Sequence, residues 1–315
     1  MALFDVRGHG GKLSTTEDTE DTEVLASRNF LCVLCGGEST EMKIAYQGEP
    51  GAFSEAASRL VNADAAFIPC KSFEEVFASV QQGPAQYGVL PIENSIGGSI
   101  HRNYDLLMEN HLPIVGEVEV PVVHHLLALP GASLPAIKRV YSHPQALAQC
   151  ERFLRTLTGV EIIATYDTAG SAKMVRDGQL TDTAAIASAR AGEIFGLAPL
   201  ASSIQDFSDN ITRFIVIGRR PLNDTPPNKT TIVFSLPNEA GSLFKALSAF
   251  ALRGVDLTKL ESRPIPGRPW EYLFYVDLAA ARDELPCQRA LAHLAEFAPV
   301  LRTLGSYTRW KGQPS

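Results

Sequence analysis

The sequence lacks the features that mark membrane and nucleic-acid-binding proteins. Across its 315 residues, charges, Gly or Pro interrupt every apolar stretch before the about 20 residues that a membrane-spanning helix needs. There is no run of basic residues, and the formal net charge is -7, so the concentrated basic face of a nucleic-acid binder is missing. The five cysteines are irregularly spaced, which excludes a disulfide framework in a chain this long. We therefore predict a cytoplasmic protein without a membrane or nucleic-acid partner.

Residues 1–41 differ in composition from the rest of the chain. The stretch 15–23 is almost entirely Thr, Glu and Asp, a composition that favours disorder. It lacks the basic start and apolar core of a secretory signal, and it is too acidic for a typical transit peptide. Cys32 and Cys35 form an isolated CxxC without the second pair or βαβ context that a zinc or redox site needs. We predict an acidic, disordered tail over residues 1–41.

The remaining sequence divides into two regions with different patterns of predicted strands and helices. In residues 42–218 short β-type runs alternate with helical patterns, which predicts an α/β fold on mainly parallel sheets. These strands are too many for one modest sheet, so we predict two lobes with a hinge near residues 116–122 and a last strand that returns to the first lobe. Three prolines in residues 219–229 indicate a linker. Residues 230–308 follow the order βαββαβ, which predicts a ferredoxin-like module before a short tail over 309–315.

Two loops at predicted strand ends carry glycine, amide and acidic side chains. The glycines of residues 47–54 can expose backbone N–H groups before a helix, which suits an anion. After the next buried strand, Glu93 is a candidate general acid or an orienting group. Asn94 and Ser95 are candidates to hold a carboxylate.

Two further loops place polar residues at predicted helix N-termini. Ser142 or His143 caps a helix whose first turn contains Pro144 and Gln145. Thr168, or the Asp before it, caps another. Capping alone explains these residue types, and a ligand bound at either helix start would also meet them.

The fifth loop, residues 210–214, opens a strand that is otherwise apolar. Thr212 supplies a proton donor, and Arg213 supplies a planar fork that suits a carboxylate. Strand ends of α/β proteins open on clefts where small ligands bind. Together the five loops predict a cleft for a small dicarboxylate or an amino acid, which is bound for chemistry or for sensing.

Nothing in the sequence calls for a metal or an organic cofactor. His124 and His125 flank an apolar run without metal-ligand partners at useful spacing, and we interpret them as structural. The glycines near residue 48 lack the Lys and the spacing of a Walker loop.

At these loops the sequence resembles the prephenate dehydratase family and its close relative, arogenate dehydratase. Ordered blocks carry the resemblance: QGEPGAFSE from Gln47, PIENSIGGSIHRNYDLL from Pro91, SHPQALAQCE from Ser142, DTAGSA from Asp167, AAIASARAGEIFGL from Ala184, NITRF from Asn210 and ESRP from Glu261. The resemblance implies a bilobal catalytic domain shaped like type II periplasmic binding proteins, followed by an ACT regulatory domain.

The resemblance also implies a carbon–oxygen lyase that converts prephenate to phenylpyruvate in phenylalanine biosynthesis, without a cofactor. Thr212 would then donate a hydrogen bond or a proton to the departing hydroxyl. Arg213 would bind a carboxylate, Phe214 would form a wall beside the ring, and Glu93 would be a rival acid or an orienting residue. Substrate contacts are further expected from Gln47, Gly48, Asn94, Ser95, Ser142, Gln145, Thr168 and Asn210.

In the ACT domain the resemblance implies that L-phenylalanine binds between subunits and inhibits. ACT pairing predicts a homodimer or homotetramer. Ser242 and Asp256 stand where bacterial members usually have Ala and Asn. The expected effector contacts are Gly241, Ser242, Leu243, Asp256, Glu261, Ser262, Arg263 and Pro264.

Two alternatives stay open. The blocks SIHRNYDLL, SHPQALAQCE and DTAAIASARA resemble the plant branch, whose members often prefer arogenate, and this wording leaves the plastid stroma as an alternative location. Bilobal clefts and ACT modules also bind amino acids without chemistry, so a non-catalytic sensor is the second alternative. The hydroxyl of Thr212 beside Arg213 and Phe214 argues for an enzyme, because a sensor needs no group aimed at a leaving hydroxyl.

Overall fold

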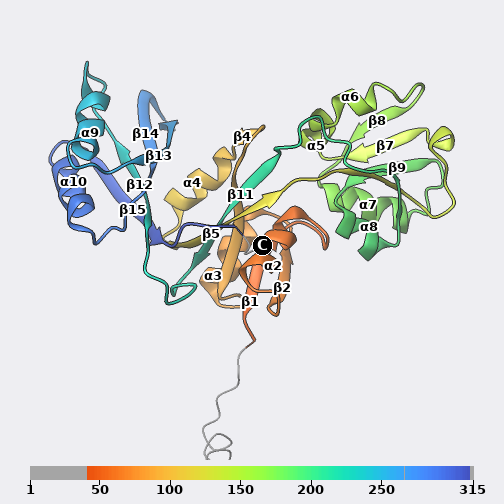
Figure 1. The fold of residues 1–315 in the computed structure, drawn as a ribbon, viewed down its shortest axis with the longest axis horizontal. Helices are drawn as coiled ribbons and strands as arrows, with labels where there is room; N and C mark the ends of the chain where they lie inside the picture. The colour runs from red at the N-terminus through yellow and green to blue at the C-terminus, as the bar shows by residue number, and fades with distance from the viewer. Residues whose placement is uncertain (1–40, 266, 313–315) are drawn as a thin grey trace, which may run out of the picture. The chain divides into compact units, whose positions relative to one another are not determined.

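Strands from both ends of residues 42–218 combine in the first sheet of the computed structural model, which describes residues 41–265 and 267–312. β1 runs parallel to β2 and β3, whereas β11 is antiparallel to both of its neighbours. The last strand of this region thus lies inside the sheet that the first strands begin (Figure 1). In spatial order the strands are β2 (Ala66–Cys70), β1 (Lys43–Gln47), β3 (Tyr87–Asn94), β11 (Ile211–Gly218) and β5 (Ile114–Pro121), with β4 (Gly98–Ser99) paired to β3.

Strand β11 is apolar on both faces because each face packs into a different core. Phe214 and Val216 belong to a cluster that also includes residues of helix α2 (Phe53–Val61). Ile215 and Ile217 belong to a second cluster with residues of α3 (Phe73–Gln82) and α4 (His101–Glu109). Side chains alternate along a strand, so neighbouring residues of β11 enter opposite layers of the molecule.

Local signals account for the ends of α3. Ser72 caps its N-terminus and accepts a hydrogen bond from the backbone N–H of Glu75. Gly83 ends the helix with φ of 99°, a left-handed conformation that glycine adopts without strain.

A second sheet forms the other lobe, and the chain passes between the lobes twice. Residues 122–124 lead into this sheet and residues 202–210 lead back. The sequence placed the hinge at 116–122, whereas β5 continues to Pro121 because that residue still pairs with Ile211 of β11. In spatial order the strands are β10 (Ala198–Ala201), β6 (His125–Ala128), β9 (Thr183–Ala187), β7 (Arg139–Ser142) and β8 (Glu161–Ala164). The helical segments are η1 (Leu134–Ala136), α5 (Pro144–Gln149), α6 (Glu151–Leu154), α7 (Thr168–Asp177) and α8 (Ala189–Phe195).

The C-terminal region folds as the predicted βαββαβ module. Its antiparallel strands β12 (Lys229–Ser235), β13 (Leu257–Ile265), β14 (Arg268–Leu278) and β15 (Val300–Tyr307) take the order β13-β14-β12-β15. Residues of α9 (Ser242–Ala251) and α10 (Leu285–Ala295) form one core with this sheet. Val233, Tyr275 and Leu304 instead join the cluster of α3 and α4, so the sheet also packs against the first lobe. The predicted fold class is confirmed.

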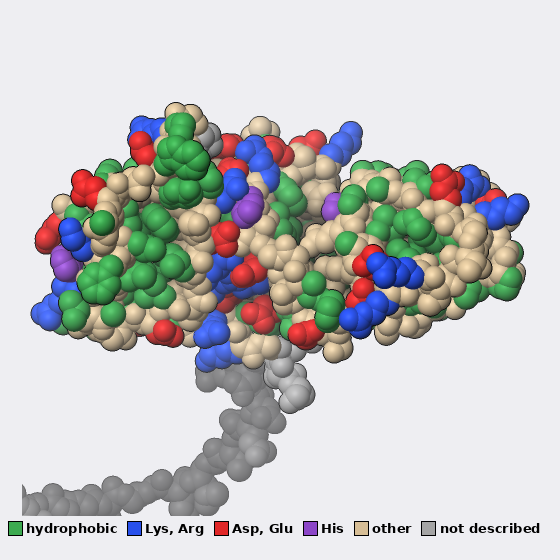
Figure 2. Space-filling model, turned by 90° about the horizontal axis from the view of Figure 1, so that it is seen from above, with side chains coloured by type: hydrophobic (Ala, Val, Ile, Leu, Met, Phe, Trp, Pro, Cys, Tyr) green, Lys and Arg blue, Asp and Glu red, His purple; other side chains and the backbone are tan. Residues whose placement is uncertain are grey.

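None of the helices in the described ranges is both long and apolar enough to cross a bilayer. On the face drawn in Figure 2, basic and acidic side chains are interspersed. The predicted N-terminal tail, apart from Glu41, and the CxxC of Cys32 and Cys35 lie outside the described residues.

Candidate active site

A cavity of about 380 Å³ is lined by loops and helix starts of both lobes. Helices α2 and α7, of nine and ten residues, begin at this cavity, and Ser54 and Thr168 from their first turns line it. Helix N-termini expose backbone N–H groups and carry partial positive charge, which favours anions. Ala52, the cap of α2, makes no side-chain hydrogen bond to that helix. The start of α2 therefore offers an anion-binding environment at the cavity, whereas the start of α7 is already capped by the carboxylate of Asp167.

Thr212 lies in the cavity wall and is held there by Asn94. The side chain amide of Asn94 donates to Thr212 Oγ1 at 3.0 Å and to Asn210 Oδ1 at 2.7 Å. Its own oxygen accepts from the backbone N–H of Gly97 at 2.7 Å, which fixes the orientation of the amide. Since the Thr212 oxygen accepts from Asn94, its own proton remains available for another acceptor in the cavity.

Gln149 and His124 extend this network behind Asn94. Asn210 donates to Gln149 Oε1 at 2.9 Å, and His124 Nε2 lies 3.0 Å from the same oxygen. An amide oxygen only accepts, so Nε2 of the histidine carries the proton and Nδ1 is left as an acceptor. Nδ1 is buried and has no hydrogen-bond partner among the described residues. Burial lowers the pKa of His124, which keeps the ring neutral near neutral pH.

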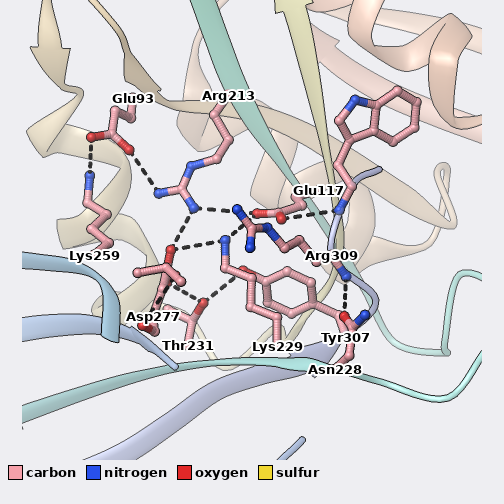
Figure 3. Close-up of polar contacts among 12 residues, drawn as sticks. Glu93, Glu117, Arg213, Asn228, Lys229, Thr231, Lys259, Asp277, Tyr307 and Arg309 are labelled. Carbon is pink, nitrogen blue, oxygen red and sulfur yellow. Dashed lines mark hydrogen bonds and ion pairs between the residues drawn. The ribbon is translucent and has the colours of Figure 1, made fainter. Parts of the chain in front are cut away.

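Arg213 and Glu93 do not line the cavity. In the register of β11 with β3, Thr212 faces Asn94 and Arg213 faces Glu93, so the second pair points to the other side of the sheet. There Arg213 Nη2 donates to Glu93 at 2.9 Å and Nη1 donates to Asp277 of β14 at 2.6 Å (Figure 3). The expected direct contact of Arg213 with a substrate carboxylate is therefore not supported, and neither is an acid role for Glu93 inside the cleft.

Several other expected residues do line the cavity. Gln47, Gln145, Thr168 and Phe214 are brought together there with Asn94 and Thr212. They come from β1, α5, α7 and β11, which are far apart in the sequence and meet only in the folded chain.

The remaining expected residues support the cavity from outside it. Ser95 donates to the backbone oxygen of Asp209 at 2.8 Å, and Ser142 donates to that of Ile186 at 2.7 Å. Asn210 is buried behind Asn94, as described above. Gly48 adopts φ of 115°, and a Cβ there would lie 3.0 Å from the Cβ of Ala52. We assign these residues to positioning the loops.

Sequence reasoning missed several cavity residues. Tyr166, Phe53 and Phe73 supply aromatic walls, and Gln149 and His124 supply polar ones. The Phe53 ring meets the His124 ring edge-on, with centroids 5.6 Å apart. Gln149 follows Gln145 by four residues, a helical spacing that could have identified it as a second amide on the same face of α5.

The cavity holds little formal charge of its own. Among the described residues no Lys or Arg lines it, and Asp167 is its one carboxylate. Burial raises the pKa of Asp167, although the backbone N–H groups of Glu49 and Gly170 oppose this by donating to it, each at 3.2 Å. No cluster of three or more potential metal ligands occurs in the described part of the chain.

The expected effector residues of β13 point alternately to the two faces of the ACT sheet. Glu261 accepts a hydrogen bond from Ser99 at 2.8 Å and pairs with His101 at 3.2 Å. Arg263 donates to both carboxylate oxygens of Asp105, at 2.6 and 2.8 Å. The alternating residues Ser262 and Pro264 of β13 are exposed, and so is Asp256. Gly241 caps α9, and Ser242 and Leu243 line a small pocket of about 110 Å³ with Trp270.

Comparison with known proteins identifies the fold of both regions. The pattern of the prephenate dehydratase family matches residues 44–222, and that of the ACT domain matches residues 230–286. The chain belongs to the prephenate dehydratase family. It is accordingly a lyase of the dehydratase type with a C-terminal ACT domain.

Plant proteins are similar to this family member over most of its length. Arogenate dehydratase/prephenate dehydratase 6, chloroplastic, of Arabidopsis thaliana is 49% identical over 85% of this chain and 69% of its own. Arogenate dehydratase 1 of Petunia hybrida is also 49% identical, over 84% of this chain and 66% of its own. The chain thus spans about two thirds of each of these relatives.

Two solved structures share the whole architecture. A prephenate dehydratase from Arthrobacter aurescens, in complex with L-Phe, is 34% identical with a TM-score of 0.78, and the match covers 87% of this chain and 92% of that one. GqqA, described as a novel type of quorum quenching acylase, is 37% identical with a TM-score of 0.77, over 85% of this chain and 98% of that one. Two proteins with this fold are therefore described with different activities, one as a dehydratase and one as an acylase.

Proposed function

We propose that this enzyme converts prephenate to phenylpyruvate in phenylalanine biosynthesis and that Thr212 protonates the departing hydroxyl. The observation that carries this proposal is the hydrogen bond from Asn94 to Thr212 Oγ1 at the cavity wall. This bond leaves the threonine proton free and stabilises the negative charge that develops on the oxygen as the proton leaves.

The reaction needs little more than orientation and one proton. The bond between the ring and its carboxylate breaks and releases CO₂, and its electron pair enters the ring. The hydroxyl across the ring leaves with its own bonding electrons, and a proton from Thr212 turns it into water. The ring becomes aromatic, which drives the reaction. A free alcohol is a poor acid near neutral pH, so the alkoxide left on Thr212 is a strong base. It recovers a proton from solvent.

The substrate carboxylates would bind to neutral donors rather than to an arginine. Ser54 and Thr168 lie at the N-terminal ends of α2 and α7, and the amides of Gln47 and Gln145 line the same cavity. Helix starts stabilise anions at modest cost, since their N–H groups are already oriented. Phe214 and the aromatic residues of the wall would pack against the ring.

Arogenate is the second candidate substrate, and specific observations favour it. Arogenate carries an ammonium group where prephenate carries a keto group, so its side chain offers hydrogen-bond donors. Among the described residues, the cavity holds one carboxylate, that of Asp167, which would suit the ammonium group. The similar plant proteins are named for arogenate.

The experiment is a comparison of kcat/KM for prephenate and arogenate with the purified chain. Phenylpyruvate from prephenate at a higher kcat/KM supports the main proposal, and phenylalanine from arogenate at a higher kcat/KM supports the alternative. Absence of product from both substrates would contradict both and favour an amino-acid sensor. Hydrolysis of an acylated quorum-sensing substrate instead would assign the acylase activity described for GqqA.

Regulation and location belong to the same proposal. We expect L-phenylalanine to inhibit through the ACT domain, by analogy with the complex described for the Arthrobacter protein. We propose that the ACT domains pair in a homodimer or homotetramer and that the effector binds between them. Inhibition is measured by titrating activity with L-phenylalanine, and assembly by light scattering.

The chloroplastic relatives favour the plastid stroma over the cytoplasm that composition predicted. Microscopy of the tagged full chain distinguishes these locations.

A further inference from the structure

Six charged side chains meet where the ACT sheet packs against the first lobe (Figure 3). Three are acids and three are bases, so their charges balance. The catalytic domain supplies one residue each from β3, β5 and β11, and the ACT domain supplies one each from β12, β13 and β14. They are Glu93, Glu117, Arg213, Lys229, Lys259 and Asp277.

Arg213 is the centre of this group, which we call the interface charge cluster. Its Nη1 lies 2.6 Å from Asp277 and 3.4 Å from Glu117, and its Nη2 lies 2.9 Å from Glu93. Lys229 bridges two of the acids, at 2.7 Å from Glu117 and 3.2 Å from Asp277. The side chains of Glu117 and Asp277 are 1% and 6% exposed, so the loss of one partner would leave a nearly buried charge uncompensated.

The pairing outweighs the cost of burial for the central residues. Burial alone would lower the pKa of Arg213, but the charge of Asp277 reverses this and raises it. Burial would likewise raise the pKa of Asp277, yet Arg213 and Lys229 hold it below its ordinary value. Both groups are therefore ionised at neutral pH, and the cluster is a set of charged contacts.

Two residues of the cluster, Arg213 and Glu93, directly adjoin Thr212 and Asn94 in the sequence. Thr212 lies opposite Asn94 in the register of β11 and β3, and Arg213 lies opposite Glu93. Fixing Arg213 and Glu93 on the back of the sheet fixes the backbone from which Thr212 and Asn94 project into the cavity. We infer that Arg213 is a positioning residue, through which Asp277 of the ACT domain holds the Thr212 hydroxyl in its reactive orientation. This inference rests on the proposed role of Thr212.

A second ion pair across the same interface supplies a matched control. Arg263 of β13 contacts Asp105 of α4 at 2.6 Å, and the Asp105 side chain is 32% exposed. This pair also joins the ACT sheet to the first lobe, but Asp105 lies on a helix and not on a strand that carries a cavity residue. Asp277→Asn and Asp105→Asn therefore each remove one charge from the interface, and only the first touches the positioning residue.

The first test compares these variants without phenylalanine, using the substrate that the wild-type protein turns over. We expect Asp277→Asn to lower kcat by about 10- to 100-fold with little change in KM, because small misplacement of a reacting group costs that much. Asp105→Asn should keep kcat within about twofold of the wild type. Arg213→Lys, which keeps the charge, should retain more activity than Arg213→Gln. An unchanged kcat in Asp277→Asn, or an equal loss in both Asp variants, would overturn the inference.

A milder pair of variants covers the case in which Asp277→Asn does not fold. Thr231 Oγ1 donates to Asp277 at 2.7 Å, whereas its neighbour Thr230 donates to the backbone oxygen of Ala280 at 2.8 Å. Both threonines are buried in β12, and each also shares a hydrogen bond with a second hydroxyl, that of Tyr307 for Thr231 and that of Ser306 for Thr230, so each valine variant loses two hydrogen bonds at similar volume. We expect Thr231→Val to lower kcat about three- to tenfold and Thr230→Val to leave it near the wild-type value. Equal values of kcat in the two variants would contradict the inference.

Hydrogen exchange gives a readout that does not depend on activity. If Asp277 positions β11, then amides of residues 211–214 should exchange faster in Thr231→Val than in Thr230→Val. Equal exchange rates in that segment would overturn the positioning role even if the wild-type protein proved inactive on both substrates. Inactive wild-type protein with faster exchange would instead contradict the proposed reaction and leave the mechanical link supported.

Discussion

The two faces of the β3–β11 pair differ in charge, although they are built from neighbouring residues. On the cavity face, Asn94 and Thr212 are neutral and joined by a hydrogen bond of 3.0 Å. On the opposite face, Glu93 and Arg213 form an ion pair at 2.9 Å, and Arg213 also contacts Asp277 of the ACT domain. A shift of one residue along each strand thus separates the proposed proton donor, Thr212, from ion pairs between the two domains.

The difference follows from where each face obtains its counter-charges. The cavity face receives charge from the anionic substrate that we propose, so neutral donors and helix starts suffice there. The back face receives no ligand, so its buried charges must be balanced by protein side chains. A substitution on the cavity face should therefore change turnover directly. A substitution on the opposite face should change turnover through the position of Thr212.

The largest expected effect tests the front face directly. Thr212→Ala removes the proposed proton donor, and we expect kcat to fall by about 10²- to 10⁴-fold while substrate binding is largely retained. Single-turnover kinetics and equilibrium binding measure the two quantities. Thr212→Ser keeps a hydroxyl and is the control, with at most a modest loss. Full activity in Thr212→Ala would eliminate the assignment.

A smaller effect should distinguish adjacent residues of β3. Asn94→Asp replaces a donor to Thr212 by an acceptor, so the threonine proton would be drawn to the carboxylate and kcat should fall about 10- to 100-fold. Glu93→Gln weakens pairing with Arg213 and Lys259 on the back face, and we expect a loss of only a few-fold. Steady-state kinetics on both variants provide the comparison. A severe loss in Glu93→Gln with normal turnover in Asn94→Asp would favour Glu93 as the acid.

The smallest expected effect concerns stability rather than turnover. Burial holds the pKa of His124 below the ordinary value of 6.5, so its neutral form stabilises the folded state above that pH. This contribution should be lost as the pH falls from about 6.5 toward the lowered pKa of the folded protein. We expect Tm to decline more steeply between about pH 7 and pH 5 in the wild type than in His124→Asn. His125 and His143 are present in both proteins, so a difference isolates His124; parallel curves would contradict the prediction.

The sequence predicted the strand of Thr212 but not the direction of its side chains. A strand with one polar face reveals which residues point inward. In β11 both faces are apolar after Arg213, because Phe214 and Val216 enter one core and Ile215 and Ile217 enter another. Thr212 and Arg213 therefore looked equally placed for the cleft, and both were expected to contact substrate.

The buried polar network could not be read from the sequence for a different reason. Asn94, Gln149 and Asn210 come from separate segments, and each amide alone looks like an ordinary loop or helix residue. His124 looked structural because no metal-ligand partner stands near it in the chain. Only their meeting behind Thr212 gives these groups a shared role.

Local sequence patterns were sufficient to predict the features that depend only on neighbouring residues. The sequence alone determined the alternation of strands and helices, the βαββαβ order of the C-terminal module and the block around Thr212, since these follow from periodicity and short motifs. The tertiary structure decided which face of β11 meets the cavity and which meets the ACT domain. Arg213 and Asp277 are 64 positions apart, and their contact depends on how two sheets pack, which no local pattern specifies.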